Sequence, residues 1–213
     1  MSDGGYGDFE FERRFVARDV PAELLAQSPP TLVVQAYFLA ADGYALRLRV
    51  QSDTARAALG PATDPVAVLE EHAAAFDFCA LTAKGPAAGG TRYEAERELD
   101  VSVGVQMLRR GGLRIVKNRH SMWLGEDGWV VDVFGGENHP LVVAECERSG
   151  PVVDLQIPDF CVTEVTDDTR FSNDGLVHRP FGTWASEWEH ELAVRGPRFA
   201  QTFGHNEVLH EEL

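Results

Sequence analysis

Cysteine is scarce in this sequence, and its scarcity excludes two kinds of architecture. The 213 residues include three cysteines, Cys79, Cys146 and Cys161. An odd number of cysteines without metal-ligand spacing argues against a disulfide framework and against a structural zinc site. We therefore interpret these side chains as small buried hydrophobic groups.

Basic residues are also few. The sequence has 19 Lys and Arg against 34 Asp and Glu, which gives a formal net charge of −15. Binding to a nucleic-acid backbone requires a basic surface, so we expect no nucleic-acid partner. The balance does not exclude a small polyphosphate ligand, because a pocket can be locally basic inside an acidic molecule.

Long apolar runs and targeting features are absent as well. No stretch approaches the length of a membrane span, and residues 1–8 lack the layout of a signal peptide. We therefore expect a cytoplasmic protein with no membrane partner. Apolar residues make up 44% and charged residues 25%, which is typical of one globular domain. Residues 85–90 are glycine-rich but lack the Gly-Lys-Ser/Thr sequence of a phosphate-binding P-loop.

The sequence does contain a strand in which charged and aromatic side chains alternate, Phe9-Glu10-Phe11-Glu12-Arg13-Arg14-Phe15. Successive side chains of a β-strand point to opposite faces, so Glu10, Glu12 and Arg14 share one face. Two carboxylates in register can hold a hard cation such as Mg²⁺ or Mn²⁺. A guanidinium beside them can hold a phosphate. For this stretch taken alone, a solvated strand face is the alternative.

Eight segments are predicted as strands, mostly joined in hairpins: 9–16, 32–40, 44–50, 76–84, 91–99, 113–124, 129–134 and 141–148. Asp42-Gly43 and Asp127-Gly128 are hairpin-turn signals. Helices are predicted at 21–27, 64–75, 100–110 and 184–195. An antiparallel sheet of this size tends to curl and close. The expected fold class is therefore α+β, a closed antiparallel eight-stranded β-barrel with helices packed outside.

Most of these strands carry two charges of one sign, two positions apart: Glu10/Glu12, Arg47/Arg49, Glu94/Glu96, Lys117/Arg119 and Glu145/Glu147. Lys84 and Asp132 add single charges. A solvated barrel surface could explain any one pair, but it would be expected to mix signs along each strand. Pairs sorted by strand instead predict a lumen with an acidic wall for metal and a basic wall for phosphate.

The stretch EFERRF resembles the Glu-x-Glu-x-Lys signature of the CYTH superfamily, also called triphosphate tunnel metalloenzymes. The resemblance continues in order through segments 44–49, 81–85, 92–96, 117–120, 129–134, 144–147 and 164–168, and it covers roughly residues 9–181. It implies a closed tunnel of eight strands that binds triphosphates together with Mg²⁺ or Mn²⁺.

The resemblance also implies a role for each charged residue of the lumen. The expected metal ligands are Glu10, Glu12, Asp132, Glu145 and Glu147. The expected substrate-binding residues are Arg14, Arg47, Arg49, Lys84, Arg92, Lys117, Arg119 and Arg170. The expected catalytic residues are Glu94, Glu96 and Lys117. Either of the two glutamates would orient the attacking water or take its proton.

Three features depart from the family pattern. Arg14 stands where the signature has Lys, and the two side chains are not interchangeable. Residues 51–75 resemble an insertion, and residues 182–213 are expected to form a C-terminal helical extension. Between a flexible N-terminus at 1–8 and this extension, residues 9–181 would form the tunnel domain. Whether the chain forms a homodimer is left open.

By this resemblance the chain is expected to be a divalent-metal-dependent triphosphatase, with inorganic tripolyphosphate as its substrate. A class IV type adenylate cyclase, a thiamine triphosphatase, and a non-catalytic module that binds polyphosphate or nucleotide are the alternatives. No aromatic or amide cluster accompanies the lumen charges in sequence. The expected partner is therefore a small phosphate chain, with little recognition of an organic tail.

Overall fold

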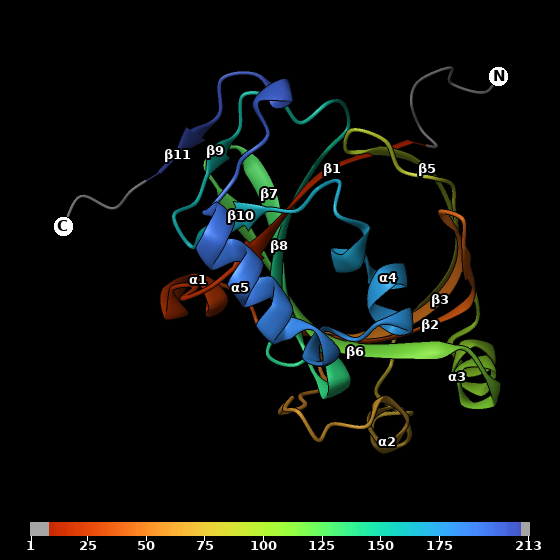
Figure 1. Ribbon diagram of the computed structural model, residues 1–213. Coiled ribbons are helices and arrows are strands. Elements are labelled where there is room, and N and C mark those ends of the chain that lie inside the picture. The colour runs from red at the N-terminus through yellow and green to blue at the C-terminus, as the bar shows by residue number, and fades with distance from the viewer. Residues whose placement is uncertain (1–8, 210–213) are drawn as a thin grey trace, which may run out of the picture.

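Eight antiparallel strands form a closed barrel in the computed structural model, which describes residues 9–209 (Figure 1). The strands are β1 (Phe9–Ala17), β2 (Thr31–Ala41), β3 (Tyr44–Ser52), β4 (Phe78–Lys84), β5 (Thr91–Glu98), β6 (Leu113–Leu124), β7 (Asp127–Phe134) and β8 (Val142–Arg148). Their order around the barrel is β1-β5-β4-β3-β2-β6-β7-β8, and β8 pairs back with β1. The predicted fold class is confirmed, whereas the expectation for residues 1–8 lies outside the described residues.

The remaining elements are short. The helices are α1 (Ala22–Leu25), α2 (Pro65–Glu71), α3 (Val101–Arg110), α4 (Asn173–His178) and α5 (Ala185–Arg195). Single 3₁₀ turns occur at Gly136–Asn138, Thr169–Phe171, Phe181–Thr183 and Gln201–Phe203. The short strands are β9 (Gln156–Ile157), β10 (Cys161–Glu164), which extends the sheet beside β1, and β11 (Glu207–Val208), which pairs with β9. Among residues 9–209, no helix is both long and apolar enough to cross a membrane.

Two hairpin turns test the turn signals. The β2–β3 turn falls at Asp42 and Gly43, with φ of 53° and 81°, as predicted for a tight hairpin. The prediction for the β6–β7 turn was wrong by two residues, because the chain turns at Gly125-Glu126 and Gly128 pairs with Trp123 within the sheet. The physical reason is the Asp127 carboxylate, which accepts two hydrogen bonds from the Arg148 guanidinium and so stays in the ladder.

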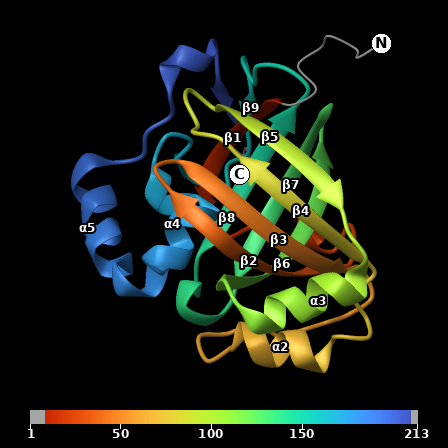
Figure 2. The same ribbon diagram turned by 90° about the vertical axis from the view of Figure 1, so that its right-hand side faces the viewer.

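The outer face of β2 and β3 is apolar and is covered by α2 and α3 (Figure 2). Asp64 and Asp100 accept backbone N–H groups at the starts of these helices and so act as N-caps. Gly104 allows α3 to lie close to the sheet, because a Cβ at this position would stand 2.2 Å from the Cys79 sulfur. Residues 51–75 form part of this covering layer. Their description as an insertion stays a prediction.

The opposite side of the barrel is covered by the segment that follows β8. Phe11, Phe15 and Trp129 pack there against Leu155 and Phe160. The packing uses the face of β1 that alternates with Glu10, Glu12 and Arg14. The apolar outer faces expected from the sequence are therefore present on two sides of the barrel, and the charged faces turn inward.

One end of the barrel is covered by α4 (Figures 1 and 2). Leu176 of α4 belongs to the same apolar cluster as Ile115 and Phe134 of the barrel. Between α4 and α5, Trp184 and Trp188 pack against Phe171 and Phe181 with ring centroids 5.0–6.0 Å apart. We call these four residues the aromatic wedge. The aromatic wedge holds α4 against this end.

Candidate functional site

A cavity of about 560 Å³ lies inside the barrel and is lined mainly by charged side chains. The predicted site residues that line it are Glu10, Glu12, Arg14, Arg47, Arg49, Lys84, Glu94, Glu96, Arg119, Glu145 and Glu147. They come from six different strands. Alternation along each strand points these side chains inward. The charged pairs therefore line a lumen, as the sequence pattern predicts.

The order of the strands sorts the lumen charges by sign. The acidic pairs lie on β8, β1 and β5, which are neighbours, and the basic side chains other than Arg14 lie on β4, β3 and β6. Across the β1–β8 closure, Glu12 stands opposite Glu147 and Arg14 opposite Glu145. The lumen therefore has an acidic wall (Glu10, Glu12, Glu94, Glu96, Glu145 and Glu147) and a basic wall (Lys84, Arg47, Arg49 and Arg119).

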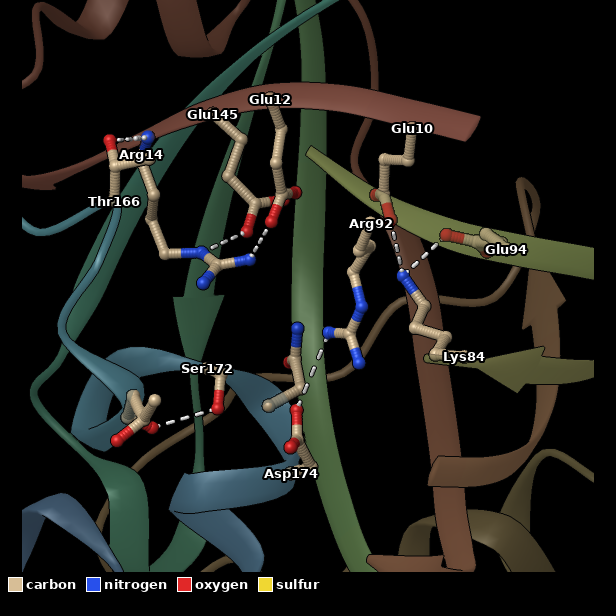
Figure 3. Close-up of polar contacts among 12 residues, drawn as sticks. Glu10, Glu12, Arg14, Lys84, Arg92, Glu94, Glu145, Thr166, Ser172 and Asp174 are labelled. Carbon is tan, nitrogen blue, oxygen red and sulfur yellow. Dashed lines mark hydrogen bonds and ion pairs between the residues drawn. The ribbon is translucent and has the colours of Figure 1, made fainter. Parts of the chain in front are cut away.

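Two cations tie the acidic wall together (Figure 3). Arg14 Nε donates to Glu145 Oε1 at 2.8 Å, and Arg14 Nη2 donates to Glu12 Oε1. Lys84 Nζ reaches Glu10 at 2.8 Å and also pairs with Glu94. All six side chains are largely buried, so these ion pairs are weakly screened by solvent.

The cations do not balance the acidic wall evenly. Burial raises the pKa of Glu12 to about 7, and the charges of Glu145 and Glu10 add to that rise against the effect of Arg14. Burial and the charges of Glu10 and Glu145 also raise the pKa of Glu147. Burial is again the main cause for Glu94, whose pKa is raised to about 7, and the hydrogen bond that its protonated form donates to Glu10 adds to the rise. Glu12, Glu94 and Glu147 are therefore the carboxylates of this wall that the neighbouring cations neutralise least, whereas the pKa of Glu10 and of Glu145 is lowered.

The basic wall has hydrogen-bond capacity that the protein does not use. Arg47 Nη2 donates to Thr82 Oγ1 at 2.9 Å, and Arg49 Nη2 contacts the Glu96 carboxylate at 3.2 Å. Arg47 Nε and Arg49 Nε are buried and have no acceptor among the described residues. A buried donor without a partner costs free energy, so these two N–H groups favour an acceptor that enters from outside.

Lys117 and Asp132 lie behind the lumen surface. Lys117 is 1% exposed, and its ammonium donates to Asp132 Oδ2 and to Asn173 Oδ1. Arg119 makes two further hydrogen bonds to Asp132, at 2.8 and 2.7 Å. Burial lowers the pKa of Lys117 to about 8, although the charge of Asp132 opposes this. Because Asp132 does not line the cavity and cations bind both of its oxygens, its position does not support the expected metal-ligand role.

Two further predicted substrate-binding residues, Arg92 and Arg170, do not line this cavity, although Arg92 lines an adjoining one with Glu12 and Arg14. Arg92 donates to the backbone oxygens of Gly85 and Gly43, and its guanidinium is 3.8 Å from Asp174. Arg170 follows β10, pairs with Asp168 and Glu191, and stacks over Trp184 outside the barrel. These partners hold the guanidinium of Arg170 away from the lumen, so its position gives no support to the expected phosphate contact.

The sequence reasoning missed Asn173, which lines the cavity, and three buried polar residues of the inward strand faces, Gln35, Tyr37 and Thr82. Gln35 and Tyr37 pair in register with Arg49 and Arg47, so they share the inward face. Their signal was weak, since β2 reads as an almost continuous apolar run. Thr82 was in phase with Lys84 and could have been found by the same alternation. Asn173 lies on α4, far from any strand pattern.

The acidic wall offers carboxylate oxygens to a metal ion. Within residues 9–209, no three His, Cys, Asp or Glu side chains are already arranged as a metal-binding group. The donor set nevertheless suits a hard cation, since among the described residues Glu12 has a partner at one carboxylate oxygen only and Glu147 has none. Glu10, Glu12, Glu145 and Glu147 are the residues that fit such an ion.

Comparisons with known proteins agree with this geometry. No protein-family model matches the chain. Over 103 residues, 47% of this chain, it is 36% identical to an inorganic triphosphatase of Acetivibrio thermocellus, and the match spans 66% of that relative's length. Two solved structures of the protein NE1496 cover 79% of this chain. One is described as a hypothetical protein (26% identity, TM-score 0.51, 97% of its chain covered) and the other as an inorganic triphosphatase (25%, 0.50 and 93%).

The fold and the cavity together define a class of protein. It is a closed antiparallel barrel whose lumen opposes an acidic wall to a basic wall. In sequence and in fold, the chain resembles the triphosphate tunnel proteins of the CYTH superfamily. The resemblance carried by EFERRF and the segments that follow it is thereby confirmed.

Proposed function

We propose that this chain hydrolyses triphosphates and that inorganic tripolyphosphate is its preferred substrate. The observation that carries the proposal is the basic wall, where Arg47 Nε and Arg49 Nε are buried donors without an acceptor. A phosphate oxygen supplies the missing acceptor and the opposite charge. The sequence relative named inorganic triphosphatase supports the same substrate class.

The proposal includes a divalent cation, Mg²⁺ or Mn²⁺, held by Glu10, Glu12, Glu145 and Glu147. These carboxylates line one side of the cavity, and carboxylate oxygens are the ligands that both ions prefer. The raised pKa values of Glu12 and Glu147 support a cation at this place, because a bound cation would offset the cost of burying their charge. When bound, the ion supplies positive charge that offsets the charge developing on the transferred phosphoryl group.

The chain's own residues divide the remaining work. Arg47, Arg49 and Arg119 bind oxygens along the phosphate chain and hold it straight against the basic wall. Glu94 and Glu96 line the cavity beside this wall, and one of them orients the attacking water and accepts its proton. Arg14 and Lys84 stand next to the acidic wall and neutralise charge near the reacting phosphate.

A phosphate-release screen tests the proposal. Purified protein is incubated with tripolyphosphate, pyrophosphate, thiamine triphosphate and nucleoside triphosphates, each with Mg²⁺, Mn²⁺ or EDTA, and orthophosphate and cyclic nucleotide are measured. We expect the highest kcat/KM with tripolyphosphate, dependence on a divalent ion, and no cyclic nucleotide. Cyclic nucleotide formed from ATP would instead indicate a cyclase. Binding of every compound without turnover would indicate a binding module.

A further inference from the structure

Asn173 lies where the cavity ends against α4. It is the first residue of that helix and lines the cavity, whereas Lys117 directly behind it does not. Lys117 Nζ donates to Asn173 Oδ1 at 3.1 Å. The Asn173 side chain thus stands between the buried ammonium and the open lumen.

The chemistry of Lys117 fixes the orientation of the Asn173 amide. An ammonium group can only donate hydrogen bonds, so the amide must turn its oxygen toward Lys117 and its nitrogen away. Asn173 Nδ2 donates to no described residue, since the contact with Lys117 is the one side-chain hydrogen bond that Asn173 makes within residues 9–209. The amide therefore keeps two N–H groups for a ligand.

The floor beneath Asn173 is apolar. Leu176 lies one helical turn further along α4 and packs with Ile115 and Phe134 of the barrel. The aromatic wedge supports α4 from behind. A phosphate chain that reaches this part of the lumen meets Asn173 in front of the apolar floor.

From these contacts we infer that Asn173 is a specificity-determining residue, which rests on the proposed function. Its Nδ2 donates a hydrogen bond to the terminal phosphate of the bound chain, and α4 sets the length of chain that the lumen accepts. Lys117 acts through Asn173, because it holds the amide in the donating orientation. In this inference, α4 recognises the terminal phosphate of the substrate.

Two substitutions at Asn173 separate these roles. Asn173→Asp has nearly the same shape and keeps an oxygen for Lys117, but it replaces the donor with a negatively charged acceptor. We expect KM for tripolyphosphate to rise on the order of 10-fold or more, with a smaller change in kcat, because a hydrogen bond to a charged group is lost. Asn173→Ala removes both contacts. We expect it to raise the ratio of kcat/KM for tetrapolyphosphate to that for tripolyphosphate several-fold.

The matched control is Gln106→Glu, which makes the same amide-to-carboxylate change on the exposed side of α3. It should leave KM, the chain-length ratio and the melting temperature unchanged. The inference is overturned if Asn173→Asp keeps the wild-type KM, or if both Asn173 variants lower the melting temperature and weaken all phosphate chains equally. Should the wild-type protein bind tripolyphosphate without hydrolysing it, the proposed function fails, and calorimetric Kd values for tripolyphosphate and tetrapolyphosphate then replace KM and kcat/KM in the same comparisons.

Discussion

Glu12 is the carboxylate of the acidic wall whose substitution tests the proposed metal site. It lies between Glu10 and Glu145 on the inward face, and burial raises its pKa to about 7. Glu12→Gln keeps the shape of the side chain and deletes one metal-binding charge. We expect kcat for tripolyphosphate to fall on the order of 10²-fold, as when a main electrostatic contact to a transition state is lost. Steady-state kinetics at saturating Mg²⁺ or Mn²⁺ measures the change.

The control for this substitution is Glu71→Gln at the exposed end of α2. It deletes the same charge outside the barrel and should keep full turnover. Folding of Glu12→Gln should be intact, because the substitution relieves repulsion among neighbouring carboxylates. Equal turnover in Glu12→Gln and Glu71→Gln would contradict the metal-site assignment.

Arg13 shows what the opposite face of the same strand does. It is fully buried, donates two hydrogen bonds to Glu164 at 2.9 and 2.8 Å, and reaches Asn206 at 2.6 Å. Its guanidinium also stacks over Phe203, 4.5 Å from the ring centroid. The residue thus fastens the C-terminal segment to β1 and does not face the lumen.

Breaking this contact should cost stability more than activity. Arg13→Gln leaves the Glu164 carboxylate buried without its partner, so we expect the free energy of unfolding to fall by about 3–5 kcal/mol. Urea denaturation measures this loss. The double variant Arg13→Met with Glu164→Leu removes both charges and should recover part of it. A loss below about 1 kcal/mol for Arg13→Gln would show that the ion pair is dispensable.

At the scale of single residues, the alternation of side chains along a strand predicted many of the residues that line the cavity. It separated Arg13 from Arg14, and it placed Glu10, Glu12, Arg47 and Arg49 on inward faces. Alternation tells which face of the strand a side chain is on, but not how far it lies from the cavity surface. It could not show that Lys117 and Asp132 lie behind that surface. Nor could it find Asn173, whose position depends on a short helix held in place by aromatic packing from a later segment.

Among the elements, α5 contributes chiefly through its aromatic face. Trp188 is 5% exposed and meets Phe171 and Phe181 edge to face, with centroids 5.5 and 6.0 Å apart. Trp188→Ala should lower the free energy of unfolding by about 3–5 kcal/mol, because it leaves a large cavity. Denaturant unfolding, followed by circular dichroism, provides the measurement.

Trp123→Ala is the matched control for this element. Trp123 is 71% exposed and lies across the ladder from Gly128, so its removal should cost under about 1 kcal/mol. If the two Trp variants were equally stable, the aromatic wedge could not be what holds α4 and α5 against the barrel.

The sequence predicted the ends of helices and strands correctly where neighbouring residues alone determine them. Asp64 and Asp100 cap their helices as the sequence predicts, and the Asp42-Gly43 turn is correct. The β6–β7 turn was misplaced because a distant side chain, Arg148, holds Asp127 in the sheet. Turn prediction uses only residues that are adjacent in sequence. It cannot include a side chain that hydrogen-bonds from another strand.

The whole molecule combines an acidic composition with a basic wall inside. Its formal net charge is −15, yet β4, β3 and β6 gather their cations on one side of the lumen. The sorting of charges by strand could be predicted, but the order of the strands could not, because β1 pairs with β5 and β8, which are remote in sequence. Closure of the barrel alone brings the acidic strands side by side.

The central claim is that the basic wall binds the phosphate chain that is hydrolysed. The most direct measurement compares kcat/KM for tripolyphosphate in the wild-type protein, Arg49→Gln and Arg110→Gln at saturating metal. Arg49 lines the lumen with a buried, unpartnered Nε–H, and Arg110 is exposed at the end of α3. We predict a loss on the order of 10²-fold for Arg49→Gln and none for Arg110→Gln. Equal kcat/KM values in all three proteins would contradict the account.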